Sequence, residues 1–307
     1  MKKLIGCSFL AMTIALSGCH KDKTTQEPYL IFKFKFDPNQ ERLDNFGNTS
    51  TMPANHAGQS PTFKYMCAHY LEMAPDRYTQ IGAGTVLYHA EETTLGGSTA
   101  IVFEKEVLTK NDSVFLKIPL KDVKAGSYEW LRVSLAYQNY EVNFLLDTNY
   151  NVGGTNYPIY QEFPCEIASF VGFNSYIKSY KLHSQTVTVN ANKAQGYWGS
   201  EAYGTVYGQA FNQVNTGQSP AGSTTVVNPI EATSPIPRLS NSCLATGQFE
   251  GGNLVITGKE TSDIVVTVSL SVNKSFEWVE VVNDGKWEPF KGEQVVDMGI
   301  RGLKALH

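Results

Sequence analysis

One stretch of the chain decides the fold: Leu30–Phe36, with the sequence LIFKFKF. Successive side chains of a β-strand point to opposite faces, so Phe32, Phe34 and Phe36 share one face and the lysines share the other. The stretch therefore predicts a strand with one buried and one solvated face. The next residues, Asp37–Asn39 (DPN), are typical of a turn that ends such a strand.

Alternation of this kind recurs along the chain, most clearly in Ser127–Asn143 and Asp263–Val272. Shorter apolar, aromatic and β-branched segments also predict strands. They are Phe63–Met73, Thr85–His89, Ile101–Glu106, Ile167–Tyr176 and Gln185–Asn190. Gly196–Tyr207 fits either a strand or a loop, and Asn253–Thr257 is expected to form a hairpin with Asp263–Val272. No long helical pattern occurs, so we expect an all-β, antiparallel β-sandwich that can carry elaborated loops.

The first residues are typical of an export signal. Lys2 and Lys3 precede an apolar run, Leu4–Leu16, that is too short to span a bilayer as a stable helix. The run ends in Leu16–Cys19 (LSGC), which resembles the lipobox of bacterial lipoproteins, where a cysteine carries the diacylglycerol. We therefore expect residues 1–18 to be a signal peptide and Cys19 to be lipidated. The polar residues 19–28 are expected to form a flexible tether.

The residue after the expected lipidation site indicates whether the inner or the outer membrane holds the protein. An aspartate there would favour retention in the inner membrane, and the chain has His20 instead, which favours the outer membrane. Lys21-Asp22 resembles the charged export signals of Bacteroidota surface lipoproteins, so a periplasmic and a surface orientation both stay open. No other stretch approaches the roughly 20 apolar residues of a transmembrane helix, so we expect the lipid to be the membrane attachment.

Residues 29–307 are expected to form one β-sandwich domain, although two smaller β domains are an alternative. The segment Gln213–Ser242 is rich in Pro, Ser, Thr, Asn and Gly and has no periodic apolar face, which predicts a long loop near residues 213–242. The chain has a net charge of −4, and 18% of its residues are charged. This composition provides no basic surface for nucleic acid.

Three cysteines remain once Cys7 in the signal and Cys19 are set aside: Cys67, Cys165 and Cys243. An odd number leaves at least one thiol unpaired or joined to another chain. In an oxidising compartment we expect a disulfide between Cys165 and Cys243.

Cys67 and His69 lie two residues apart, so in a strand over Phe63–Met73 their side chains would point to the same side. Together with His56 and His89 from neighbouring segments, they form a candidate site for copper or zinc. The alternative is a buried free cysteine beside a histidine that is hydrogen-bonded within the core.

A second candidate metal segment is Asp147–Gly154 (DTNYNVGG), which offers oxygen-bearing side chains at alternate positions, as calcium loops do. The EF-hand pattern fails because Gly153 stands at position seven and Pro158 at position twelve. Asp, Asn and Gly are also the residues of tight turns. We therefore favour a plain hairpin loop over a calcium site for this segment.

Aromatic rings can stack on the C–H faces of sugars while polar groups bind the hydroxyls. The segment Gly196–Tyr203 places glycines beside Tyr197, Trp198 and Tyr203, and these three residues are the candidate glycan-binding site. Aromatic residues are also common in strands, so a core or loop-anchoring role is the alternative.

Several segments together resemble uncharacterised envelope lipoproteins of Bacteroidota. They are the first Phe-Lys-Phe strand, the turn Val123–Tyr128 (VKAGSY) before a long alternating strand, and the late segment Gly258–Val272. Ser275–Trp278 (SFEW) and Val296–Gly302 (VDMGIRG) also resemble that group, which brings no assigned chemistry. More remotely, the layout is similar to the MbnP-like family of periplasmic copper-binding β-sandwich proteins. That resemblance implies copper binding in the periplasm.

The chain has no catalytic signature of the G-x-S-x-G or H-E-x-x-H type, and it has neither a phosphate loop nor a dinucleotide fingerprint. We therefore expect a lipid-anchored, non-enzymatic envelope lipoprotein with a ligand-binding or accessory role. Three classes stay open: a periplasmic copper- or zinc-binding module, a surface glycan-binding protein, and a partner of another envelope protein.

Overall fold

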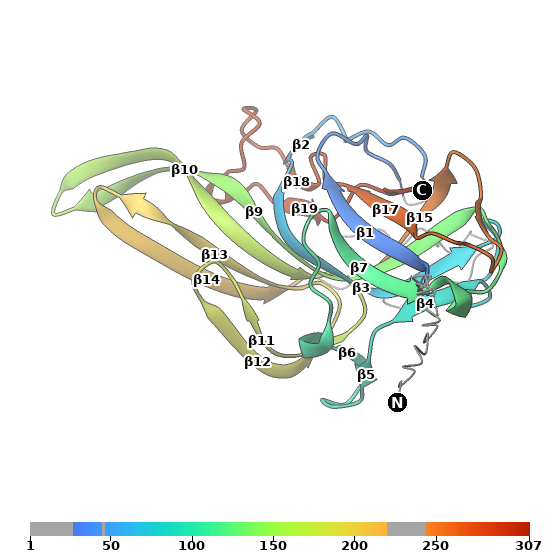
Figure 1. Ribbon diagram of the computed structural model, residues 1–307. Helices are drawn as coiled ribbons and strands as arrows, with labels where there is room; N and C mark the ends of the chain where they lie inside the picture. Colours follow the sequence, from blue (N-terminus) through green and yellow to red (C-terminus); the bar gives the residue numbers. More distant parts are fainter. Residues whose placement is uncertain (1–26, 45–46, 220–242) are drawn as a thin grey trace, which may run out of the picture.

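The structure is a computed structural model that describes residues 27–44, 47–219 and 243–307 (Figure 1). The expected all-β fold is confirmed, because the regular structure of these residues consists of β-strands and three single-turn 3-10 helices. The 3-10 helices are η1 (Phe103–Lys105), η2 (Leu120–Asp122) and η3 (Pro289–Lys291). Within the described ranges, no helix is both long and apolar enough to cross a membrane.

Most strands belong to one extended sheet of eleven strands. Nine of them follow the order β14-β13-β10-β9-β15-β20-β17-β1-β7, and β3 lies beside this path, paired with both β9 and β4. Their bounds are β1 (Tyr29–Asp37), β3 (Thr62–Ala74), β4 (Thr85–His89), β7 (Ser113–Pro119), β9 (Trp130–Val152), β10 (Thr155–Phe170), β13 (Tyr197–Val206), β14 (Gln209–Gln218), β15 (Cys243–Glu250), β17 (Ile264–Ser271) and β20 (Leu303–Leu306).

Strand β1 shows how the sequence builds this sheet. Its burial alternates as its sequence predicts: Phe32 and Phe34 are fully buried, whereas the lysines are half-buried. The buried face meets apolar side chains of β3, β9, β15 and β17 in a first core cluster. The sheet curls round this core, so that β4 and β7 meet through Tyr88 and Phe115, whose ring centroids lie 4.9 Å apart.

Strand β9 joins the two halves of the molecule. Its first half pairs with β3 on one side and β15 on the other, and its second half pairs with β10. The β9–β10 hairpin projects from the body of the molecule, at the left of Figure 1. It turns at Gly153 and Gly154, whose φ angles of 58° and 86° suit a tight two-residue turn.

Two small sheets cover the two faces of the extended sheet around β9 and β10. On one face the sheet β12-β11-β6-β5 encloses a second core cluster, and on the other face the sheet β19-β18-β2 encloses a third. The β16 and β8 strands pair separately. The bounds are β2 (His56–Gln59), β5 (Glu92–Thr93), β6 (Ala100–Val102), β8 (Gly126–Tyr128), β11 (Ser175–Lys181), β12 (Thr186–Lys193), β16 (Leu254–Ile256), β18 (Phe276–Val279) and β19 (Val295–Met298). These stacked layers have the sandwich-like character that the sequence predicts.

Two prolines explain why β10 and β13 part from each other. The two strands pair only along Cys165–Phe170 of β10, and Pro164 stands where this pairing stops. Pro158 lies six residues earlier, on the same edge of the strand. Because the pairing of β10 with β9 runs unbroken past both prolines, their nitrogens face β13, where they cannot donate. The tips of the β9–β10 and β13–β14 hairpins therefore splay apart.

The structure corrects the expected connections between strands. Asp263–Val272 does contain a strand, β17, but that strand pairs with β1 in parallel and with β20, and it makes no hairpin with Asn253–Thr257. The latter segment contains β16, which pairs with β8. The sheets are mixed rather than purely antiparallel. The predicted loop near residues 213–242 is wrong at its start, because β14 extends to Gln218, and residues 220–242 lie outside the described residues.

The expected disulfide between Cys165 and Cys243 is wrong, because both cysteines are free and buried. The register explains this: Cys165 lies opposite Val142 of β9, whereas Cys243 lies opposite Leu135 of the same strand. Seven residues of a strand span about 23 Å. A disulfide needs Cα atoms within about 7 Å of each other.

Candidate metal centre

The candidate centre begins with His69, in the buried part of β3. Its side chain is 9% exposed, and its ring stacks on Phe173 with 5.2 Å between the ring centroids. His69 Nε2 donates a hydrogen bond to Glu92 Oε1 at 2.9 Å. Burial, as the largest influence, lowers the pKa of His69 below its ordinary value of 6.5, so the imidazole is neutral at neutral pH.

His89, the last residue of β4, brings a second imidazole to the same place. In the pairing of β3 with β4 it lies opposite Tyr70, the residue after His69. His89 Nδ1 donates a hydrogen bond to the carbonyl oxygen of Ala90 at 3.0 Å. Because a carbonyl can only accept, Nδ1 carries a proton, and in the neutral form of the ring Nε2 is the nitrogen with the lone pair. Half of the His89 side chain is exposed to solvent.

Glu92, the first residue of β5, supplies a carboxylate between the two imidazoles. Its Oε1 lies 2.9 Å from His69 Nε2 and 3.6 Å from His89 Nε2. The ligand atoms of the three side chains all lie within 4.8 Å of one another. Bonds of about 2.1 Å in a tetrahedral zinc site place neighbouring ligand atoms roughly 3.4 Å apart, so the distances of 2.9 Å and 3.6 Å bracket the spacing that the ion needs.

One further atom of His69 bears on metal binding. Its Nδ1 is buried, and no described residue forms a hydrogen bond with it. A neutral histidine that donates through Nε2 leaves an unused lone pair at Nδ1. When Nε2 binds a metal, the ring proton moves to Nδ1, where no described residue accepts it, and this unmet hydrogen bond lowers the metal affinity.

The structure places the other two predicted ligands elsewhere. Cys67 is fully buried in the second core cluster, where its thiol is hydrogen-bonded to the carboxyl group of Glu106. His56 begins β2, in the small sheet on the opposite face, and its Nδ1 lies 2.6 Å from Glu277 Oε1. The predicted set of four therefore does not assemble. Of its members, His69 and His89 are the two that come together.

Glu92 is the ligand that sequence reasoning missed. It stands three residues after His89, and residues three apart in one strand point to opposite faces, so this spacing gives no signal within a continuous strand. The two side chains meet because the chain passes from β4 into β5 between them. A pattern of His-x-x-Glu across a strand end is the signal that could have found it.

A second group of ligand-type side chains also converges: the ligand atoms of Glu141, Glu166 and His183 lie within 4.8 Å of one another. Here Lys64 already provides a cation. Its ammonium group pairs with Glu166 and lies 3.7 Å from Glu141 Oε2. A metal ion would have to displace this lysine, so we interpret the group as an ion-pair network.

The three aromatic residues expected to bind glycans do not form one platform. Tyr197 is 7% exposed and packs in the second core cluster. Trp198 follows it on β13 and therefore points to the opposite face, where its indole packs over Gly217. Tyr203 stacks on His183, with 3.7 Å between the ring centroids. The predicted patch is thus divided between two faces of the sheet.

The segment considered for calcium forms the end of the β9–β10 hairpin. Asp147–Val152 belongs to β9, and the two glycines make the turn, as the hairpin alternative predicts. In a strand, side chains two residues apart are separated by about 6.6 Å, so the oxygens of Asp147, Asn149 and Asn151 cannot surround one ion. Asp147 Oδ2 instead pairs with Lys291 Nζ at 2.8 Å.

Comparison with known proteins adds no relative: no protein-family model, no curated protein and no solved structure matches this chain. The candidate centre therefore rests on its own geometry.

Proposed function

We propose that this protein is a lipid-anchored, metal-binding protein of the bacterial cell envelope, and that His69, His89 and Glu92 hold zinc or copper(II). The observation that carries the proposal is the convergence of two imidazole Nε2 atoms on one carboxylate oxygen. Half-exposed His89 lets a metal ion reach the centre from solvent. Three protein ligands leave a fourth position for water or for a ligand atom of a partner.

The donor set favours borderline divalent metals. Imidazole nitrogen suits zinc and copper, whereas calcium takes six to eight oxygen ligands and finds one carboxylate here. The thiol of Cys67 lies outside the group, so no thiolate is present to favour copper(I). We therefore expect Zn²⁺ and Cu²⁺ to bind, with Cu²⁺ the tighter of the two.

Metal loading of the full-length protein, purified from membranes in mild detergent, tests the proposal. The wild type, stripped with a chelator and reloaded with Zn²⁺, is expected to retain one equivalent in elemental analysis. The double variant His69→Ala/His89→Ala is expected to retain none. A matched control, His183→Ala/His307→Ala, also removes two histidines but leaves the centre intact, so it should retain zinc like the wild type.

Either of two results would contradict this assignment. One is a wild type that retains no Zn²⁺ or Cu²⁺. The other is a control variant that loses as much metal as His69→Ala/His89→Ala. The single change Glu92→Gln keeps the size of the side chain and removes its charge, and it should weaken zinc binding by at least the roughly 10- to 100-fold that the loss of a residue supporting a ligand costs.

The lipid anchor is the second part of the proposal. It is supported by the sequence around Cys19, which lies outside the described residues. Cells fed a clickable fatty acid are expected to label the wild-type protein and to leave a Cys19→Ser variant unlabelled. Equal labelling of the two proteins would reject lipidation at Cys19.

A further inference from the structure

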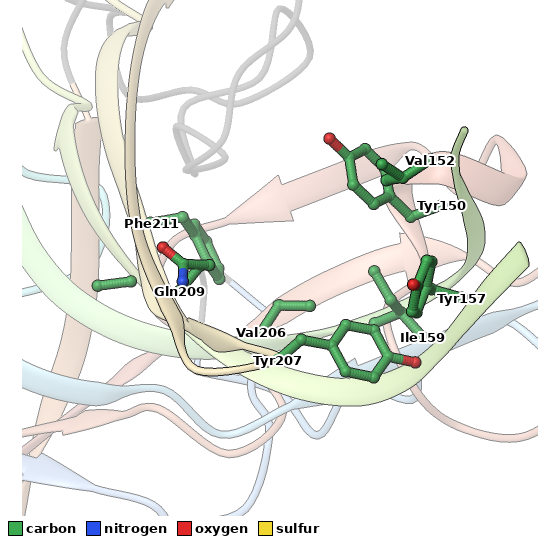
Figure 2. A pocket seen from close by; sticks show the side chains of 9 residues that line it. Tyr150, Val152, Tyr157, Ile159, Val206, Tyr207, Gln209 and Phe211 are labelled. Carbon is green, nitrogen blue, oxygen red and sulfur yellow. The ribbon is translucent and has the colours of Figure 1, made fainter. Parts of the chain in front are cut away.

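The splayed tips of the β9–β10 and β13–β14 hairpins border an open cleft of about 420 Å³. Figure 2 shows side chains of both hairpins around this space. Tyr150 and Val152 come from β9, Tyr157 and Ile159 come from β10, and Phe211 comes from β14. The register places these residues on one face of the two hairpins. A volume of this size is common among ligand-binding clefts.

The lining of the cleft is aromatic, exposed and uncharged. Tyr150 is 61% exposed, Tyr157 is 39% exposed and Tyr207 is 60% exposed. None of the residues that line the cleft carries a charge. Exposed aromatic rings grouped in one hollow are uncommon on a surface that binds nothing.

Tyr207 is held in place at a cost to the backbone. It occupies the turn between β13 and β14 with a φ of 48°, a left-handed conformation that favours glycine or asparagine. Its ring meets Tyr157 edge to face with 5.5 Å between the centroids, and its hydroxyl donates a hydrogen bond to the carbonyl oxygen of Pro158. Strain that fixes an exposed ring at a cleft points to a role for that ring.

The cleft continues into a second hollow of about 380 Å³, which shares Val206 and Phe211 with it. No charged residue lines this hollow either. Along β14, Gln209 faces the cleft, and Gln213 and Asn215 face the second hollow. These three amides are exposed, and none of them bonds a side chain or backbone group among the described residues.

We propose that this groove binds a neutral oligosaccharide chain. Exposed tyrosine rings offer flat faces for the C–H faces of sugar rings, and unpartnered amides offer donors and acceptors for the hydroxyls. An uncharged lining favours a neutral ligand over an anionic one. A wholly apolar ligand would leave the amides along β14 without partners, so sugar matches the lining better. This proposal is independent of the metal centre, which lies on β3, β4 and β5.

Calorimetric titration of the full-length protein in mild detergent tests it. The probes are four neutral hexasaccharides, built from α-linked glucose, β-linked glucose, xylose or mannose, and an anionic hexagalacturonate. At least one neutral probe is expected to bind. Tyr150→Ala is expected to weaken that binding about tenfold, since the exposed Tyr150 ring makes no hydrogen bond or ring contact with another described residue and is not needed to hold the fold.

The matched control is Tyr160→Ala. Tyr160 belongs to the same hairpin and is 67% exposed, but it points to the opposite face, so its removal should leave sugar binding unchanged. The variant His69→Ala/His89→Ala should also bind sugar like the wild type, which separates this proposal from the metal proposal. The proposal is overturned if no neutral probe binds, if the anionic probe binds as tightly as the best neutral one, or if both tyrosine variants lose binding equally. A wild-type dimer that Tyr150→Ala dissociates would assign the groove to a second copy instead.

Discussion

Arg132 Nη1 lies 3.5 Å from Glu72 Oε2, and neither side chain is exposed to solvent. The two residues belong to the paired strands β9 and β3, where they lie opposite each other. Glu72 Oε1 also accepts a hydrogen bond from the backbone N–H of Gly84 at 2.6 Å, and Arg132 Nη2 donates one to the carbonyl oxygen of Thr79 at 2.6 Å. This ion pair therefore fastens the connection between β3 and β4, and β4 carries His89.

Removal of one partner from this pair is expected to destabilise the protein strongly. Arg132→Met leaves the Glu72 carboxylate buried without its counter-ion, so we expect the free energy of unfolding to fall by about 3–5 kcal/mol. Urea denaturation followed by circular dichroism measures this. In the control variant, Lys105→Met, an exposed ion pair with Glu91 is lost, and the change should stay below about 1 kcal/mol. Similar losses in the two variants would show that the buried pair contributes no more than a surface pair.

Local alternation was enough to predict the strands but not their partners. The buried face of β1 follows from its own sequence, since Phe32 and Phe34 alternate with lysines. Its parallel neighbour β17 comes more than 200 residues later, and no feature of either segment indicates that the two strands pair. The strand within Asp263–Val272 was predicted for the same local reason. The predicted hairpin is wrong because segments close in sequence need not pair, and β16 pairs with β8 instead.

The candidate centre was predicted in part for the same reason. His69 and His89 were identified as residue types that bind metals, and the pairing of β3 with β4 brings them together. Glu92 was missed because its position depends on how the chain turns after β4. Cys67 was included because of its spacing to His69, yet its thiol is taken up by Glu106 in the core. Residue chemistry was visible in the sequence, and the packing that selects among candidates was not.

Gly172 is expected to support the metal centre from a distance. A Cβ at this position would lie 2.0 Å from the carbonyl oxygen of Leu135, and the next residue, Phe173, stacks on His69. Gly172→Ala should therefore push the Phe173 segment away from β9, lower the free energy of unfolding by about 1–3 kcal/mol and weaken zinc binding. Gly58→Ala is the control, because its Cβ would lie 3.0 Å from the carbonyl oxygens of Lys274 and Phe276 and β2 belongs to the small sheet on the opposite face of the molecule. An equal loss of zinc affinity in both variants would contradict this role of Gly172.

The number of reactive thiols in the unfolded protein tests whether the three cysteines are free and whether Cys19 is lipidated. Cys67, Cys165 and Cys243 are free and buried, and burial raises the pKa of each thiol, that of Cys165 to about 12. The native protein should therefore react slowly with a thiol reagent, and the protein unfolded in denaturant without reductant should show three reactive thiols. A count of one reactive thiol would mean that two of the three cysteines form a disulfide. A count above three would mean that Cys19 is not lipidated or that the signal peptide is retained.

The Glu106 carboxyl predicts a specific pH dependence of stability. It follows η1, its Oε2 is buried without a hydrogen-bond partner among the described residues, and burial raises its pKa from 4.5 to about 7 against the opposing hydrogen bond from Cys67. Between these two values the folded state holds the proton more tightly than the unfolded state does. The stabilising contribution of this group is therefore complete below pH 4.5, is lost as the pH rises toward 7, and stays lost above it.

Glu106→Gln removes this titration while it keeps the shape of the side chain. The difference in unfolding free energy between variant and wild type should therefore rise in favour of the variant as the pH goes from about 5 to about 8, as measured by urea denaturation at each pH. The difference cancels the contributions of other carboxyl groups, which both proteins share. The control is Glu91→Gln, which changes an exposed carboxylate that pairs with Lys105. This variant should show no such trend. A flat difference for Glu106→Gln would mean that the carboxyl is ionised in the folded protein, and the contact with Cys67 would then have to outweigh its burial.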